Sequence, residues 1–141
     1  MKTQIWAHRG ASAYAPENTL EAFRLAAEMG ADGVELDVQL SRDGELVVAH
    51  DETIDRVSSG TGYIKDYTLA QLKKLSFNRL FPNFKDARIP TLKEVYELLK
   101  PGGLTVNVEL KTGIILYPEI EEKVLALTAS MGMEDRVIYS S

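Results

Sequence analysis

The chain of 141 residues is 45% hydrophobic and 26% charged, a balance that is ordinary for one soluble globular domain. Its formal net charge of −5 argues against a nucleic-acid partner, because holding phosphates by bulk electrostatics requires clustered lysine and arginine side chains. The absence of cysteine excludes disulfide and thiolate chemistry. The sequence has neither the apolar core of a signal peptide nor an apolar run of about 18 residues, so we expect no membrane span. Cytoplasm is the expected compartment, and a mature secreted form stays open.

The first part of the chain predicts a strand, a helix and two further strands joined by a turn. In chain order these elements are Gln4–His8, Thr19–Met29, Gly33–Leu40, the turn Arg42–Gly44 and Glu45–His50. We expect Asn18 to cap the helix, with Glu21 completing a capping box. The Asp-Gly turn favours a hairpin, whereas parallel neighbours would need a crossover of about a dozen or more residues. The pairing of these two strands is left open.

The remainder of the chain contains a long irregular segment and then further helix and strand units. The segment 51–90 is expected to be mostly irregular, and loops of this length tend to serve function. The predicted elements are a short helix over Thr68–Leu75, a helix capped by Thr91 and ended by Pro101, a strand over Leu104–Leu110, a helix from Pro118 to Gly132 and a strand over Arg136–Ser140. Alternating strands and helices with short connections predict an α/β fold with a mainly parallel sheet.

The strand Gly33–Leu40 has two carboxylates on one face. Glu35 and Asp37 alternate with apolar residues, so their side chains point the same way, about 7 Å apart along the strand. They could hold one cation or act as an acid and a base. The other interpretation is an exposed strand face that happens to be acidic.

Several chemically active side chains fall at or near the carboxyl ends of predicted strands, where parallel α/β sheets bind ligands. They are His8, Glu35, Asp37, His50, Glu109 and Lys111. Three carboxylates from two strands suit a hard cation such as Mg²⁺ or Ca²⁺. The two histidines could form an acid and base pair, and Arg9 with Lys111 could attract an anionic group. Each residue also has a structural interpretation, as a surface loop, a turn hydrogen bond or an ion pair on a solvated strand.

Six short motifs in order resemble those of the glycerophosphodiester phosphodiesterase family. They are His8-Arg9-Gly10, Pro16-Glu17-Asn18-Thr19, Glu35-Leu36-Asp37-Val38, His50-Asp51, Ile89-Pro90-Thr91-Leu92 and Asn107-Val108-Glu109-Leu110-Lys111. The resemblance implies a TIM-type (β/α)8 barrel and the hydrolysis of a glycerophosphodiester to an alcohol and glycerol 3-phosphate. Alternatives are a phospholipase of the sphingomyelinase D type and a truncated half-barrel that acts as a non-catalytic binding or assembly unit.

The same resemblance implies a role for each candidate residue. A divalent cation, Mg²⁺ or Ca²⁺, would be held by Glu35, Asp37 and Glu109. The pair His8 and His50 would transfer protons, Arg9 and Lys111 would lie near the substrate phosphate, and residues 51–90 would form a small cap inserted after the third strand. A complete barrel has about 250 residues. We therefore expect this chain to supply about the first five strands, as a fragment or as a unit that associates with itself or with a missing carboxyl-terminal half.

Overall fold

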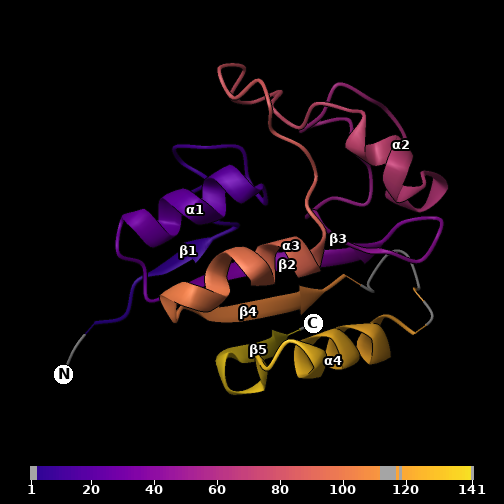
Figure 1. Cartoon of the computed structure of the whole chain (residues 1–141). Coiled ribbons are helices and arrows are strands. Elements are labelled where there is room, and N and C mark those ends of the chain that lie inside the picture. Colours follow the sequence, from indigo (N-terminus) through magenta and orange to yellow (C-terminus); the bar gives the residue numbers. More distant parts are fainter. Residues whose placement is uncertain (1–2, 112–116, 118, 141) are drawn as a thin grey trace.

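The computed structural model describes residues 3–111, 117 and 119–140, and these form one sheet with helices packed on it (Figure 1). The strands are β1 (Trp6–His8), β2 (Gly33–Leu40), β3 (Leu46–Val48), β4 (Thr105–Leu110) and β5 (Val137–Ser140). Four of them pair in the order β1-β2-β4-β5, and every pair in this series is parallel. The predicted α/β class with a mainly parallel sheet is therefore confirmed.

The helices of the described residues are α1 (Leu20–Glu28), α2 (Leu69–Lys73), α3 (Leu92–Leu99) and α4 (Ile120–Ser130), with short 3₁₀ turns at Ile64–Asp66, Lys100–Gly102 and Glu134–Arg136. Helices α1, α3 and α4 lie in the connections between consecutive parallel strands, as in the βα units of a barrel. The expected start of the last helix at Pro118 lies outside the described residues. None of the helices in the described ranges is long and apolar enough to cross a membrane.

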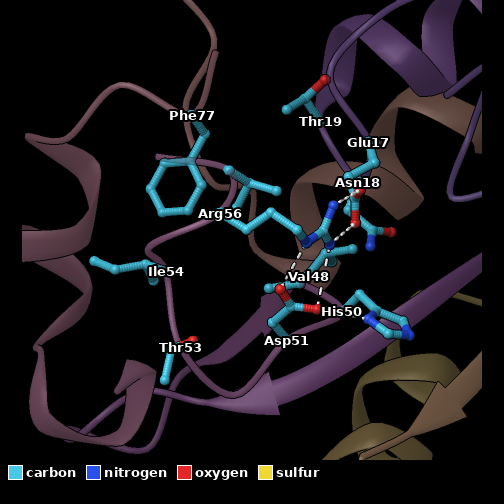
Figure 2. Close-up of a pocket in the computed structure, with 12 residues that line it drawn as sticks. Glu17, Asn18, Thr19, Val48, His50, Asp51, Thr53, Ile54, Arg56 and Phe77 are labelled. Atoms are coloured by element: carbon cyan, nitrogen blue, oxygen red, sulfur yellow. Dashed lines mark hydrogen bonds and ion pairs between the residues drawn. The ribbon is translucent and has the colours of Figure 1, made fainter. Parts of the chain in front are cut away.

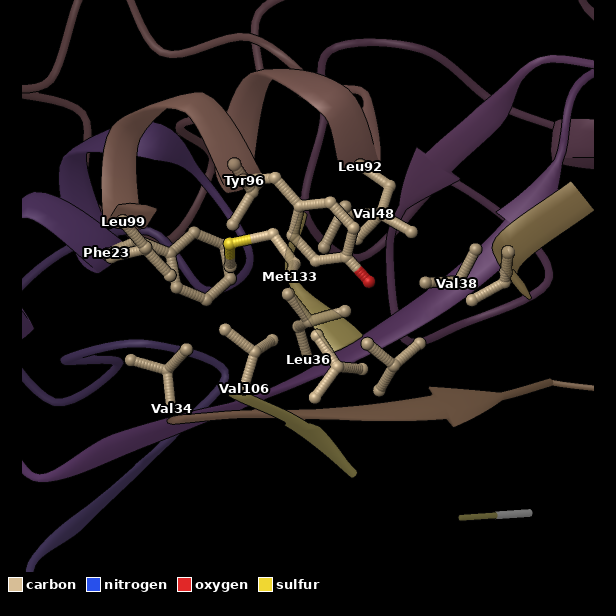
Figure 3. Packing of buried hydrophobic residues seen from close by; sticks show 14 of the residues in the cluster. Phe23, Val34, Leu36, Val38, Val48, Leu92, Tyr96, Leu99, Val106 and Met133 are labelled. Atoms are coloured by element: carbon tan, nitrogen blue, oxygen red, sulfur yellow. The ribbon is translucent and has the colours of Figure 1, made fainter. Parts of the chain in front are cut away.

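The apolar face of β2 forms the main core with α1 and α3 (Figure 3). Val34, Leu36 and Val38 are fully buried there, together with Phe23 of α1 and Tyr96 of α3. Burying one such side chain contributes about 1.5–3 kcal/mol, so this layer holds the helices against the sheet. The alternation that places these residues on one face leaves Glu35, Asp37 and Gln39 on the other face, away from the helices.

Strand β3 pairs antiparallel with the end of β2, so the Asp-Gly turn forms a hairpin. The backbone N–H of Gly44 donates to the carbonyl of Ser41 at 3.0 Å, and Gly44 adopts a φ of 79°, which glycine reaches without steric cost. The parallel neighbours of β2 are β1 and β4, and not β3, which resolves the open pairing. Strand β3 ends at Val48, so His50 lies just beyond the strand and not at its last position as expected.

Thr19, and not Asn18, caps helix α1. The Thr19 hydroxyl accepts a hydrogen bond from the backbone N–H of Ala22 at 3.3 Å. The expectation that Asn18 is the cap was wrong, because both residue types are good caps and the true first turn begins one position later. The cap expected at Thr91 is confirmed, and Thr68 caps α2 in the same way, each with a complete capping box.

Residues 51–90 pack around a second apolar cluster beside β3. Its buried members are Val47, Ala49, Ile54, Ile64, Leu72, Phe77 and Ile89. This segment is mostly without regular structure, but it is anchored by its own buried side chains.

At the outer strands, Ile5, Trp6, Ile138 and Tyr139 are exposed. Self-association through these strands stays a prediction.

Candidate active site

The sheet register brings the predicted carboxylates to one edge. Asp37 of β2 lies directly beside Glu109 of β4, and Glu35 of β2 lies beside His8 of β1. Because neighbouring strands of a sheet are about 4.8 Å apart, side chains that share a register position and a face are in reach of one another. Candidate ligand atoms of Glu35, Asp37 and Glu109 all lie within 4.8 Å of one another. The structure thus brings together the three carboxylates that the sequence singles out.

Burial makes this carboxylate cluster electrostatically costly. The side chain of Asp37 is 0% exposed, which excludes the interpretation of β2 as an exposed acidic face. Burial, and then the charge of Asp37, raise the pKa of Glu35 to about 8, and burial likewise raises the pKa of Asp37. The pKa of Glu109 is lowered, first by a hydrogen bond from Asp37 and also by the charge of Lys111.

The cluster fits a hard divalent cation. The buried Oε1 of Glu35 and Oδ1 of Asp37 have no hydrogen-bond partner among the described residues. A buried carboxylate oxygen without a partner is costly, and carboxylate oxygens are the ligands that Mg²⁺ and Ca²⁺ prefer. A bound cation would reverse the direction of these pKa shifts by favouring the ionised carboxylates.

Two basic side chains approach the cluster from β1 and β4. The Lys111 Nζ is 3.7 Å from Asp37 Oδ1 and 3.8 Å from Glu109 Oε2. The Arg9 Nε is 3.9 Å from Asp37 Oδ2, and this nitrogen has no hydrogen-bond partner in the described part of the chain. Both side chains therefore provide local positive charge at the edge where an anionic group would bind.

The loop after β1 has a backbone shape that places Arg9. Arg9 has a φ of 56°, and its N–H donates to the Glu35 carbonyl at 2.8 Å. Gly10 follows with a φ of 77°, and a Cβ at this position would come within 2.8 Å of Ala22 in α1. A left-handed conformation at a residue other than glycine is uncommon and concentrates at functional sites. The glycine of the His-Arg-Gly motif is therefore required by close contact with the helix.

The two histidines occupy different surroundings. The Nε2 atom of His8 lies 3.3 Å from Glu35 Oε2, and the His8 side chain is 65% exposed. The Nδ1 atom of His50 lies 2.8 Å from Asp51 Oδ1, and its side chain is 31% exposed. The backbone N–H of Ala49, the residue before His50, donates to the carbonyl of Asp37 at 2.9 Å, which places the His50 loop beside the cluster. Both predicted histidines thus lie at the carboxylate edge.

Further polar residues were missed as site residues by the sequence reasoning (Figure 2). Asn18 is 3% exposed, and its amide donates to Asp37 Oδ2 at 3.1 Å. Arg56 binds both Glu17 and Asp51 through its guanidinium. Glu17 and Asn18 belong to the motif Pro16-Glu17-Asn18-Thr19, one of the six on which the family resemblance rests. That motif could have indicated that they lie at the site. Arg56 lies in the irregular segment and carries no periodic signal.

Comparison with known proteins gives the family. The model of the "Glycerophosphoryl diester phosphodiesterase family" matches residues 8–140. A glycerophosphodiester phosphodiesterase of Caldanaerobacter subterraneus subsp. tengcongensis is 54% identical over 142 residues, covering 100% of this chain and 58% of that protein. A glycerophosphodiester phosphodiesterase of Bacillus altitudinis is 46% identical over 141 residues, covering 99% of this chain and 58% of that protein. The chain therefore spans about 58% of the length of these curated relatives.

Solved structures agree with this result. The glycerophosphodiester phosphodiesterase of Agrobacterium tumefaciens has a TM-score of 0.90 at 40% identity, covering 99% of this chain and 58% of that one. The Oleispira antarctica phosphodiesterase, solved in complex with the product sn-glycerol-3-phosphate, has a TM-score of 0.83 at 35% identity, covering 99% and 57%. The expected TIM-type barrel class is confirmed, and the described residues supply four of its parallel strands plus the hairpin strand β3. From the motifs, the sheet and these relatives together, the chain belongs to the glycerophosphoryl diester phosphodiesterase family.

Proposed function

We propose that the protein of which this chain is part hydrolyses a glycerophosphodiester to an alcohol and glycerol 3-phosphate. The observation that carries this proposal is the convergence of three carboxylates, His8 and two basic side chains at the carboxyl ends of parallel strands, with His50 just beyond the hairpin strand β3. The choice of substrate is supported by the relative from Caldanaerobacter subterraneus, a glycerophosphodiester phosphodiesterase, and by the sn-glycerol-3-phosphate bound to the Oleispira antarctica phosphodiesterase. Sheets of this type bind ligands at this edge.

The residues divide into three roles. A Mg²⁺ or Ca²⁺ ion held by Glu35, Asp37 and Glu109 would supply Lewis acidity and balance charge on the phosphoryl oxygens. Arg9 and Lys111 would hold the non-bridging oxygens of the phosphate, since both lie beside the carboxylate cluster.

The histidines would move the protons. One of His8 and His50 would accept the proton of the attacking nucleophile, and the other would donate a proton to the leaving alcohol. His8 is in contact with Glu35, which holds its Nε2 towards the cluster, and His50 is held through Nδ1 by Asp51. With Nδ1–H donating to Asp51, the Nε2 of His50 is free for proton transfer.

The segment 51–90 would form a small cap over this site. Its support is the separate apolar cluster beside β3 and the ion pair that joins Arg56 to Glu17 in the loop after β1. The cap would limit which alcohol group the site accepts.

The test is hydrolysis of glycerophosphocholine by the full-length protein with and without a divalent cation. We expect His50→Ala and Glu35→Gln each to lower kcat by about a hundredfold or more, because each removes a group that acts directly on the reaction. Glu97→Gln, at an exposed position of α3, is the matched control and should keep full activity.

Each alternative has its own outcome in this assay. Activity within a few-fold of the unsubstituted protein in either variant would refute the assigned roles. Preference for sphingomyelin would indicate the sphingomyelinase D type of reaction. Cation binding without turnover of either substrate would indicate a non-catalytic binding unit.

A further inference from the structure

Arg56 joins two loops that carry candidate catalytic residues (Figure 2). Its Nη1 and Nη2 bond the two carboxylate oxygens of Glu17 at 2.7 and 2.9 Å, and its Nε bonds Asp51 Oδ2 at 2.8 Å. A further contact from Nη2 to Asp51 Oδ1 measures 3.2 Å. One planar guanidinium therefore binds both carboxylates at once, an arrangement that suits arginine and not lysine. We call Glu17, Arg56 and Asp51 the arginine bridge.

Each end of the arginine bridge contacts a residue of the proposed reaction. Asp51 Oδ1 lies 2.8 Å from Nδ1 of His50, and Glu17 Oε2 lies 3.3 Å from Nη1 of Arg9. Glu17 is only 11% exposed, so this carboxylate has few alternative partners in water. The bridge thus forms a continuous chain of charged hydrogen bonds from the proposed phosphate-binding arginine to the proposed proton-transferring histidine.

The backbone on the His50 side of the bridge is fixed separately. The amide nitrogen of the buried Gln39 lies 3.2 Å, 3.1 Å and 2.6 Å from the carbonyl oxygens of Ala49, His50 and Asp51. Because Gln39 fixes the backbone of residues 49–51, the Asp51 carboxylate can still change its orientation only by rotation of its side chain. Arg56 bonds both oxygens of that carboxylate and so sets which oxygen faces His50.

We propose, on the basis of the proposed function, that Arg56 is a positioning residue that holds His50 and Arg9 in register for the reaction. It acts on His50 through Asp51, which accepts from Nδ1 and thereby leaves Nε2 for proton transfer. It acts on Arg9 through Glu17. Carboxylates that orient a catalytic imidazole in this way set its tautomer as well as its direction. Arg56 itself contacts no residue of the carboxylate cluster among the contacts of the described residues.

The kinetic test compares three variants of the full-length protein on glycerophosphocholine. Arg56→Ala should lower kcat by about a hundredfold while KM changes by less than about threefold, because a misplacement of about 1 Å costs that much in rate. Arg56→Lys should recover only part of kcat, since an ammonium cannot bond both carboxylates in one plane. Added guanidinium ion should restore part of the activity of Arg56→Ala. Arg79→Ala, in the same segment, is the matched control and should keep full activity, because among the described residues Arg79 bonds only the backbone carbonyls of Asp55 and Val57.

A second readout needs no turnover. Long-range ¹H–¹⁵N spectra, recorded above the ordinary imidazole pKa of about 6.5, report which ring nitrogen of His50 carries the proton. We expect mainly the Nδ1–H tautomer in the unsubstituted protein and a mixture of tautomers in Arg56→Ala. The signals of the His50 ring are assigned by their absence from the spectrum of His50→Gln.

The outcomes separate the two proposals. If Arg56→Ala lowers Tm but keeps both kcat and the His50 tautomer, the arginine bridge only ties the loops together and the inference is overturned. If the unsubstituted protein does not hydrolyse the substrate, the proposed function fails. The tautomer of His50 then still decides whether Arg56 orients that ring.

Discussion

At the scale of single residues, Asn18 lies against the proposed cation site and contacts one of its three carboxylates, Asp37. Its φ of 56° places it in the left-handed region, where asparagine is tolerated, and its amide donates to the buried Asp37. That hydrogen bond favours the ionised carboxylate, which is the form that binds a cation. Partners of this kind orient the metal ligands.

We therefore predict that Asn18→Gly weakens cation binding by about tenfold or more, because glycine keeps the backbone conformation and removes only the amide. Isothermal titration with Ca²⁺ or Mn²⁺ measures the change in Kd. Asn18→Ala should show the same loss together with a lower Tm, since the left-handed region costs about 1–2 kcal/mol for an ordinary residue and alanine lacks the short polar side chain that makes it tolerable for asparagine. Asn83→Ala, on an exposed loop, is the control. An unchanged Kd in Asn18→Gly would show that Asn18 does not contribute to cation binding.

Single residues also show how much of the candidate site could be predicted from the sequence. Strict alternation along β2 was enough to predict that Glu35 and Asp37 share a face, because side chains of a strand alternate by geometry. Glu109 was added to the set because it lies near the end of another predicted strand, and the parallel register of β2 and β4 explains why it lies beside Asp37. The bonds of Arg56 could not be predicted, because they join loops far apart in the sequence and follow no periodic pattern.

At the scale of elements, local turn chemistry indicated the pairing of β2 and β3 that the structure has. The Asp43-Gly44 turn favours a hairpin, and the short connection leaves no room for the crossover that parallel neighbours need. The structure has that hairpin, and β4 takes the parallel position beside β2. The segment 51–90 was harder to interpret, because the five buried residues that it contributes to the second apolar cluster are spread over loops and short helices without a period.

This second cluster predicts that the segment unfolds as a unit separate from the sheet. Leu72→Ala removes a fully buried side chain from the cluster and should cost about 2–5 kcal/mol locally. Hydrogen exchange should then become faster at amides within 51–90, such as those of Ile64 and Phe77, while the amides of β2 keep their protection. Leu36→Ala, in the main core, is the matched variant and should reduce protection in β2. Equal loss of protection in both regions after Leu72→Ala would show a single cooperative unit.

At the scale of the whole molecule, the two faces of the sheet make opposite contributions to stability. The apolar face packs against three helices, whereas the other face holds three carboxylates close together, of which Asp37 is fully buried and Glu35 and Glu109 are partly buried. Such a cluster opposes folding when the carboxylates are ionised and no cation balances their charge. The stability of the folded chain should therefore depend on pH and on divalent cations together.

The sign of this dependence follows from Glu35. Its pKa is raised from 4.5 to about 8 in the folded chain, first by burial and then by the charge of Asp37, so the folded state holds a proton that the unfolded state releases above 4.5. The free energy of unfolding must then fall as pH rises from 4.5 to about 8. The raised pKa of Asp37 acts in the same direction, and the lowered pKa of Glu109 acts only at more acidic pH.

Urea unfolding in the presence of a chelator measures this effect at about pH 5 and about pH 8.5. We expect a lower midpoint at the higher pH for the unsubstituted chain and a weaker dependence for Glu35→Gln, which cannot ionise. Added Ca²⁺ should raise the midpoint more at the higher pH. The carboxylates are already ionised there, so Ca²⁺ binds without displacing protons. Glu97→Gln, exposed on α3, should retain the full dependence. A midpoint that is the same at both pH values without cation would contradict the buried carboxylate cluster as a source of instability, because the proton held by Glu35 would then make no difference between the two states.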